Sequence, residues 1–131
     1  MSRNFDGVDD LVNFGSPVNL DNQEPLSILI WHNPDNLGEA GAGRLMTKDT
    51  SGAGFMTFVM LGSSTLFFQK DYTGGGSVDL ARQSVASTVT SGNWQHFAAT
   101  WDGSATATNV RMFRNAREVS YLTATNGAGT K

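Results

Sequence analysis

Alternation of apolar and polar residues with a period of two recurs along this chain, whereas apolar spacing of three and four residues is scarce. The pattern predicts short β-strands, separated by turn residues such as Asp6-Gly7, Gly74-Gly75-Gly76 and Asp102-Gly103. The predicted strands are Asn4-Phe5, Leu11–Phe14, Leu26–His32, Arg44–Lys48, Phe55–Leu61, Thr65–Lys70, Val78–Ala86, Trp94–Trp101, Asn109–Arg114 and Glu118–Leu122. Strands of this length and spacing predict an all-β fold, an antiparallel β-sandwich or barrel.

The chain has 131 residues, which fits one domain spanning residues 1–131. With 39% hydrophobic residues and 15 glycines, the composition is that of a globular chain with many turns. Residues 123–131 contain no apolar side chain larger than alanine. We therefore expect this tail to be flexible.

Charge and composition argue against a nucleic-acid partner and against membrane insertion, and they do not identify a compartment. Lys and Arg number 9 and Asp and Glu number 12, so the net charge is −3 and no nucleic-acid partner is expected. The longest apolar run, Phe55–Leu61, is far shorter than the ~20 residues that span a membrane, so no insertion is expected. Cysteine is absent, and Met1–Asn4 lead into the domain without an apolar export signal, which leaves the compartment open.

Catalytic motifs are missing from the sequence. No Gly-Lys pair forms a phosphate-binding loop, and no serine has glycines two residues away on both sides. Glycoside hydrolysis requires two facing carboxyl groups, but the only glutamates, Glu24, Glu39 and Glu118, are isolated. The chain is therefore predicted not to be an enzyme, and no catalytic residue is assigned.

The aromatic residues are the most informative candidates, because flat amphipathic rings stack on sugars or peptides when exposed. In Leu26–His32, one face carries Leu26, Ile28, Ile30 and His32, and the other carries Ser27, Leu29 and Trp31. For Trp31 the sequence leaves core packing and ligand stacking open. For His32 it leaves a structural role and a pH-sensing or metal-binding role open.

The second informative strand is Trp94–Trp101. Its two faces are Trp94, His96, Ala98 and Thr100 on one side and Gln95, Phe97, Ala99 and Trp101 on the other. We expect the face with Phe97 and Trp101 to point into the core, and His96 to be a structural side chain.

Four segments in a common order resemble one family. They are Phe5–Val12, the run Pro25–Trp31 followed by Pro34-Asp35, Arg44–Lys48, and Trp94–Gly103, which reads WQHFAATWDG. These segments span about residues 5–115 and resemble laminin-G-like jelly-roll domains of the concanavalin A-like lectin/glucanase superfamily. The resemblance implies a concanavalin A-like β-sandwich.

Three departures from the family pattern lead to further expectations. A polar pair, His32-Asn33, stands where the family has a β-branched residue and a lysine or similar residue. The hairpin after Asn109–Arg114 turns on Asn115-Ala116, and because alanine disfavours positive φ, we expect a different or looser turn. The chain also stops before the family's terminal strand. We expect the vacant lane to be filled by Tyr121–Lys131 folding back or by a second subunit, which would make a homodimer.

The resemblance implies a lectin-like binding module that recognises a glycan or a protein surface. It suggests stacking residues Trp31, Tyr72 and Trp101, with polar partners Asn36, Asn93 and Asp102. The competing interpretation is a structural or assembly protein of the mobile-element or phage type, working through sheet-edge contacts between copies.

Family members often bind calcium through loop aspartates and are commonly extracellular. The resemblance implies Ca²⁺ as a candidate ligand at Asp6, Asp9 and Asp102. The other interpretation of these aspartates is turn formation beside glycine.

Overall fold

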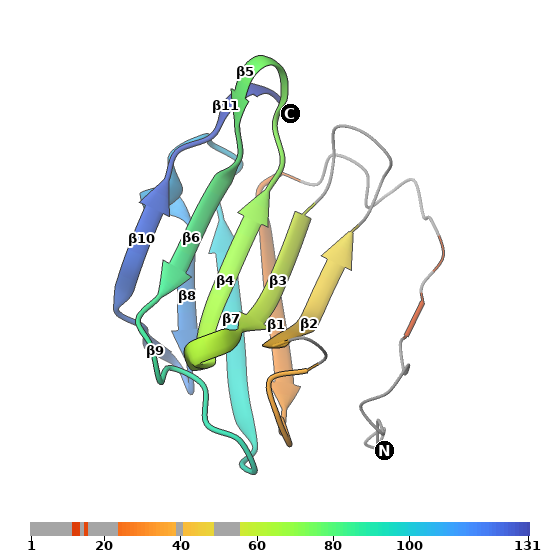
Figure 1. Cartoon of the computed structure of the whole chain (residues 1–131), viewed down its shortest axis with the longest axis vertical. Coiled ribbons are helices and arrows are strands. Elements are labelled where there is room, and N and C mark those ends of the chain that lie inside the picture. Colours follow the sequence, from red (N-terminus) through yellow and green to blue (C-terminus); the bar gives the residue numbers. More distant parts are fainter. Residues whose placement is uncertain (1–11, 14, 16–23, 39–40, 49–55) are drawn as a thin grey trace.

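The computed structural model describes residues 12–13, 15, 24–38, 41–48 and 56–131. Two antiparallel sheets lie face to face (Figure 1). The four-stranded sheet has the order β1 (Leu26–His32), β7 (Gln95–Trp101), β8 (Arg111–Arg114) and β9 (Arg117–Glu118). The five-stranded sheet has the order β10 (Tyr121–Thr125), β6 (Leu80–Ser84), β4 (Thr65–Lys70), β3 (Met56–Leu61) and β2 (Ala42–Lys48). The predicted antiparallel β-sandwich is confirmed.

A third, two-stranded sheet extends one end of the sandwich (Figure 1). It pairs β11 (Ala128–Thr130) with β5 (Thr73–Val78). Short 3₁₀ turns occupy Gly62–Ser64 and Ala107–Asn109. Among the described residues, no helix is long and apolar enough to cross a membrane.

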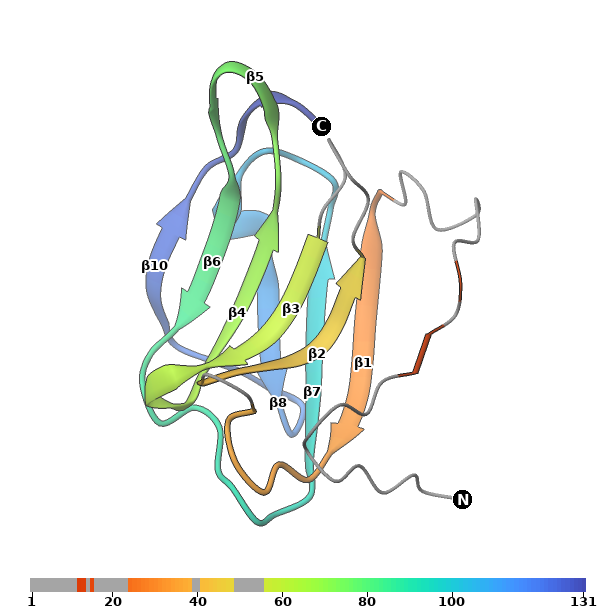
Figure 2. The same ribbon diagram turned by 45° about the vertical axis from the view of Figure 1, so that its right-hand side comes forward.

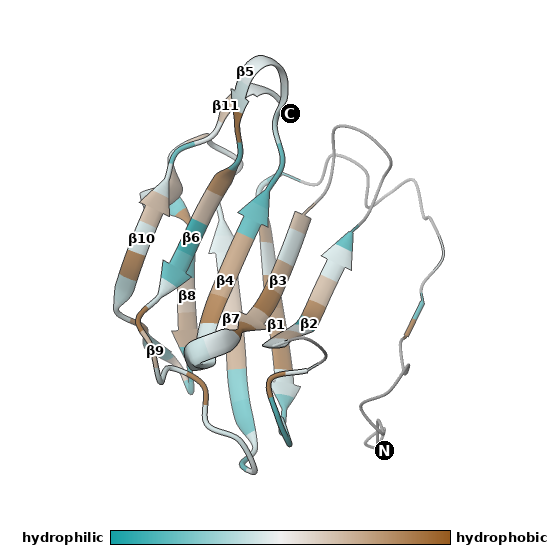
Figure 3. Cartoon of the chain, viewed as in Figure 1, coloured by the Kyte–Doolittle hydropathy of each residue, from teal (hydrophilic) through white to brown (hydrophobic). Residues whose placement is uncertain are grey.

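The core lies between the two main sheets and follows from the alternation in the strands. Phe58 and Phe68 of the five-stranded sheet and Phe97 and Met112 of the four-stranded sheet are completely buried. Figure 3 shows that apolar residues dominate β3 and β4, the central strands of the five-stranded sheet. In β7 the residues from Gln95 to Trp101 alternate as predicted, with Phe97 and Trp101 on the core face.

The predicted bounds of Leu26–His32 and Thr65–Lys70 match β1 and β4. The predicted strand Glu118–Leu122 is wrong as a single element, because the chain crosses from β9 in one sheet to β10 in the other. Gly74-Gly75-Gly76, predicted as a separator, lies in β5. Asn4-Phe5, the two end residues of Leu11–Phe14 and the first residue of Phe55–Leu61 lie outside the described residues.

The tail from residue 123 onward, expected to be flexible, forms most of β10 and all of β11. Main-chain pairing holds it, so large apolar side chains are not required. Asn126 accepts a hydrogen bond from the Ala107 N–H at 2.9 Å, and the Lys131 ammonium lies 2.6 Å from a Glu24 carboxylate oxygen. Tyr121–Thr125 therefore pairs with β6 at one edge of the five-stranded sheet. The predicted first strand, beside which the vacant lane was expected, lies outside the described residues, so how that lane is filled stays a prediction.

The hairpin between β8 and β9 corrects another expectation. Arg114 and Arg117 are directly paired, so only Asn115 and Ala116 form the turn. Their φ angles are +48° and +63°, both positive, as in the type I′ turn that we had not expected for alanine. Asn115 stabilises this turn, because it donates its N–H to the His96 carbonyl and accepts the His96 N–H through its side chain.

Candidate functional site

An exposed aromatic surface lies on the solvent side of the four-stranded sheet. It consists of Leu29 and Trp31 from β1, His96 from β7, and Trp94 from the residue just before β7. Leu29, Trp31 and Trp94 are 65%, 67% and 58% exposed. Large apolar side chains gathered on a sheet face at this exposure point to a contact surface. We call these four residues the aromatic surface.

The strand periodicity produces this surface. Leu26, Ile28 and Ile30 turn toward the core, so Leu29 and Trp31 must turn outward. Figure 2 shows β1 and β7 running side by side in one sheet. Of the two roles that the sequence left open for Trp31, core packing is excluded because its ring is outside the core, and ligand stacking stays a prediction.

Trp31 and His96 form a directly opposed cross-strand pair. Their ring centroids are 5.4 Å apart and the ring planes are tilted by 54°. Such contacts stabilise neighbouring strands and restrict the rotation of both side chains. His96 is thus a partly exposed member of the aromatic surface, in addition to its backbone bond with Asn115.

Two loops meet beside the aromatic surface. The Gly92 N–H donates to the Pro34 carbonyl at 2.7 Å, which joins the loop after β1 to the loop before β7. Asn36 and Asn93, both predicted ligand partners, lie in these loops and are exposed. The Asn36 side chain accepts the Gly38 N–H at 2.6 Å, and the Asn93 amide donates to the Ser91 carbonyl at 3.1 Å. Both asparagines therefore shape turns near Trp31.

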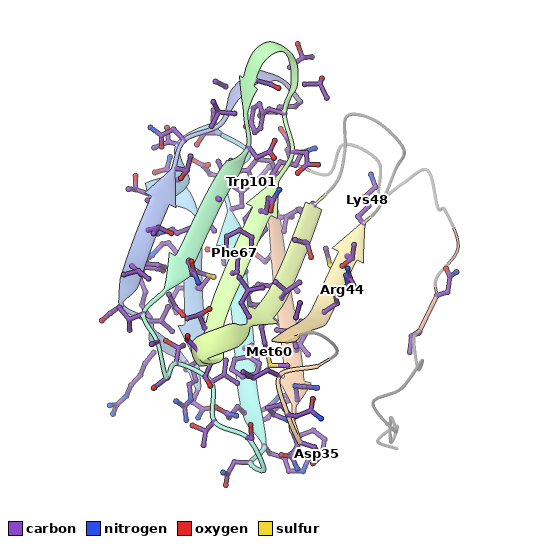
Figure 4. All side chains as sticks on the ribbon, viewed as in Figure 1. Asp35, Arg44, Lys48, Met60, Phe67 and Trp101 are labelled. Carbon is purple, nitrogen blue, oxygen red and sulfur yellow. The ribbon has the colours of Figure 1, made fainter. Side chains whose placement is uncertain are left out.

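The other three predicted ligand residues lie at the opposite end of the sandwich. Figure 4 places Trp101 toward one end of the molecule and Asp35 at the other. Trp101 is 2% exposed, and its indole N–H donates to the Ser104 carbonyl at 2.8 Å; Tyr72 is 5% exposed. Neither ring offers a free face for stacking, because both lie in the hydrophobic core. The structure does not bring these two rings together with Trp31.

Asp102 is exposed, but its carboxylate is already used. One oxygen accepts the Ser104 N–H at 2.9 Å and the other accepts the Asn109 amide at 2.7 Å. These hydrogen bonds lower the pKa of Asp102, the bond from Ser104 having the largest effect. Asp6 and Asp9 lie outside the described residues. The described residues contain no cluster of three or more metal-ligating side chains, so they do not assemble a calcium site around Asp102.

His32 lies at the end of β1 and is half-buried. Burial lowers its pKa below the ordinary value of 6.5, while the charge of Asp35 partly opposes this effect. Its Nδ1 atom and the side-chain oxygen of Asn33 are buried without a hydrogen-bond partner among the described residues. The polar pair His32-Asn33 therefore places two buried polar atoms at the end of β1, and it belongs to no metal cluster in the described part of the chain.

Trp94 and His96 were not among the site residues predicted from the sequence. The signal was available, because alternation placed both on the face of Trp94–Trp101 opposite Phe97 and Trp101. The more apolar face of this strand is the one that points into the core, so the opposite face, with Trp94 and His96, is the exposed one. Pairing with Trp31 could not be read from that pattern, because it depends on the register of β1 against β7.

Comparison with known families agrees with the fold and the sequence resemblance. A laminin-G-type family model, described as the concanavalin A-like lectin/glucanases superfamily, matches residues 6–131. No curated protein and no solved structure matches the chain. The family supports a lectin-like or binding module in general. The chain belongs to the concanavalin A-like lectin/glucanase superfamily, as a laminin-G-like domain.

Proposed function

We propose that this domain is a non-catalytic lectin-like module that binds a carbohydrate on the aromatic surface. The observation that carries the proposal is the exposure of Trp31 and Trp94, at 67% and 58%, on the solvent side of one sheet. A carbohydrate ring has an apolar face of C–H groups that packs on an exposed indole. A regular sheet also presents these rings with little rearrangement on binding.

Polar groups around the tryptophans support a sugar rather than a purely apolar ligand. The amide groups of Asn93 and Asn115 and the imidazole of His96 lie on or beside the aromatic surface. Amides and imidazoles can both donate and accept hydrogen bonds, as sugar hydroxyls require. Few polar groups around an apolar platform are typical of small-molecule sites.

A non-catalytic role is supported by the isolation of the glutamates. Glu118 is held by Arg111, with a shortest N–O distance of 2.5 Å, and by the Tyr121 hydroxyl at 3.0 Å. These contacts lower its pKa, which is the opposite of what a general acid at neutral pH needs. A glycoside hydrolase would require a second carboxyl group opposite the first.

The test is a glycan array followed by calorimetric titration of the best ligand. Trp31→Ala and Trp94→Ala should each weaken binding about fivefold or more, since an aromatic contact contributes about 1 kcal/mol beyond its buried area. Leu122→Ala is the matched control, because Leu122 is 64% exposed on β10 of the other sheet. It should bind like the unchanged protein.

Calcium and oligomeric state are tested on the same samples. We propose that calcium, if it acts through Asp6 and Asp9, changes the affinity for the glycan, which titration with and without a chelator measures. Light scattering reports whether the domain is a dimer. If no glycan binds and Trp31→Ala dissociates a dimer, the aromatic surface is an interface between copies and the carbohydrate proposal is overturned.

A further inference from the structure

Asn126 and Gly127 connect β10 to β11, and they form the only Asn-Gly pair in the sequence. Every other asparagine is followed by a residue that carries a side chain. The backbone nitrogen that follows an asparagine can attack the side-chain amide carbon, and a following side chain hinders this approach. Glycine removes the hindrance because it has no Cβ. The pair is therefore the place in this chain where the asparagine side chain is most reactive.

The reaction replaces the side-chain amide of the asparagine by a carboxylate. The Gly127 nitrogen loses its proton to solvent base and forms a bond to Cγ of Asn126. The side-chain nitrogen takes up a proton and leaves as ammonia, which closes a five-membered succinimide ring. Water then opens the ring at one of its two carbonyl carbons, giving aspartate or isoaspartate. Water is the only co-reactant, and nothing is oxidised or reduced.

In the folded chain both reacting groups are held by hydrogen bonds to the segment that follows β7. The Gly127 N–H donates to the Ala105 carbonyl at 2.8 Å, and the Asn126 side-chain oxygen accepts the Ala107 N–H at 2.9 Å. A backbone proton that is bonded in this way reaches solvent base only after the structure opens locally. Because the nitrogen attacks only after it has lost this proton, the same opening must precede the reaction.

The segment that must open lies at one end of the sandwich, where β11 pairs with β5 (Figure 1). All three residues of β11 are exposed, and a two-stranded sheet by itself is only marginally stable. An ion pair between Lys131 and Glu24, with a distance of 2.6 Å, holds the segment from its other side. Gly127 lies against the buried Tyr72 ring, where a Cβ would overlap the ring. The close contact requires glycine at this position, so the reactive pair and the packing of Tyr72 are linked.

We propose that Asn126 is a modification site, at which water converts the asparagine to aspartate or isoaspartate, and that local opening of residues 126–131 controls the conversion. Isoaspartate adds one methylene to the main chain at position 126. The bonds to Ala105 and Ala107 fix the spacing of residues 126 and 127, and the longer main chain does not match it. The isoaspartyl form therefore releases β11 from β5, and a transient opening becomes permanent.

The first experiment compares the folded protein with the protein in guanidinium chloride at one pH and temperature. Mass spectrometry follows the tryptic peptide 118–131, in which Asn126 is the only asparagine. Conversion in the folded protein should be slower by about thirtyfold, the factor that corresponds to two neutral hydrogen bonds. Equal rates would overturn the control by local opening. No conversion in guanidinium chloride would overturn the site itself.

A pair of variants tests which segment opens. Lys131→Gln removes the ion pair with Glu24 and should speed conversion in the folded protein about two- to fivefold, as expected for a partly exposed ion pair. Arg44→Gln is the matched control, because it makes the same change in net charge at an exposed position of β2. It should convert at the rate of the unchanged protein. If Lys131→Gln is no faster than Arg44→Gln, opening of residues 126–131 does not control the reaction.

The last experiment examines the product. The isoaspartyl form is separated by chromatography, and its amide hydrogen exchange is compared with that of Asn126→Asp, which adds the charge without the methylene. The isoaspartyl form should lose protection in β5, residues 73–78, whereas Asn126→Asp should keep it. Both proteins should keep the protection of β3, which is central in its sheet. Full protection of β5 in the isoaspartyl form would overturn the release of β11.

Discussion

The guanidinium of Arg82 lies 3.5 Å from the centre of the Tyr121 ring, and both side chains reach from the five-stranded sheet toward the opposite one. Arg82 donates to the carbonyls of Thr108 and Val110, which precede β8. The Tyr121 hydroxyl accepts the Met112 N–H at 2.7 Å, within β8. A stacked cation and ring thus join β6 and β10 to the four-stranded sheet.

The first prediction concerns the Tyr121 hydroxyl. Tyr121→Phe keeps the ring under Arg82 but leaves the buried Met112 N–H without its acceptor, so the free energy of unfolding should fall by about 1–3 kcal/mol. Urea denaturation measures the change. Tyr72→Phe is the matched control, because the Tyr72 hydroxyl is buried without a partner among the described residues. That variant should be as stable as the unchanged protein or more so; an equal loss in both variants would contradict the prediction.

The second prediction concerns the turn at Ala116, whose φ is +63°. The left-handed region costs a non-glycine residue about 1–2 kcal/mol, and a substitution by glycine removes this cost. Glycine also makes the unfolded chain more flexible, which lowers the free energy of unfolding by about 0.4–1 kcal/mol. Ala116→Gly should therefore raise the free energy of unfolding by about 0.5–1 kcal/mol. Ala124→Gly in β10, a strand position, should lower it, because glycine weakens strands. The two variants should differ in sign in thermal melts, and a loss at both positions would rule out strain at Ala116.

The third prediction concerns the close approach of Gly127 to Tyr72. A Cβ at Gly127 would overlap the Tyr72 ring, so Gly127→Ala must displace a buried aromatic side chain. Overpacking of this kind costs about 1–3 kcal/mol. Gly75→Ala is the control, because its Cβ would meet open space and its φ is not positive. Equal urea midpoints for the two variants would show that the chain around residue 127 moves away from the Tyr72 ring without lowering the free energy of unfolding.

The fourth prediction follows from His32. Burial lowers its pKa below 6.5 in the folded state, so at lower pH the unfolded chain binds a proton that the folded chain resists. Its contribution to stability is complete above about pH 6.5 and declines as the pH falls toward the folded-state pKa. His32→Gln should flatten the stability profile in that window, whereas His96→Gln, which retains His32, should keep the slope. Urea midpoints measured from about pH 5 to pH 8 test this, and an unchanged slope in His32→Gln would refute it.

Much of the sandwich could be predicted because one-sided burial imposes a period of two. Leu26–His32 and Thr65–Lys70 have alternating or continuous apolar residues, and their bounds matched β1 and β4. Elements held only by main-chain pairing were not predictable in the same way. The glycines of β5 and the small residues of β11 carry no apolar pattern, and their pairing joins segments that are far apart in the chain.

The candidate site was harder to predict than the fold. The residue type alone does not tell whether a tryptophan is buried or exposed, so Trp31 and Trp101 were predicted together although one is exposed and the other buried. The two differ in the face of the strand on which they lie: Trp101 is on the core face of β7, and Trp31 is on the solvent face of β1. The pairing of Trp31 with His96, and of Arg114 with Arg117, depends on register, which residue types alone do not specify.

The three tryptophans are divided between the two sides of one sheet, with Trp31 and Trp94 in solvent and Trp101 in the core. Indole emission shifts to the red in water and is quenched by collision with small solutes. The chain therefore carries two spectrally separable reporters without any label. The emission of Trp31 and Trp94, which a quencher can reach, reports whether a ligand covers the solvent side of the sheet. The blue, protected emission of Trp101 reports whether the core is intact. A single fluorescence titration can thus distinguish a ligand that covers the surface from one that merely stabilises the fold.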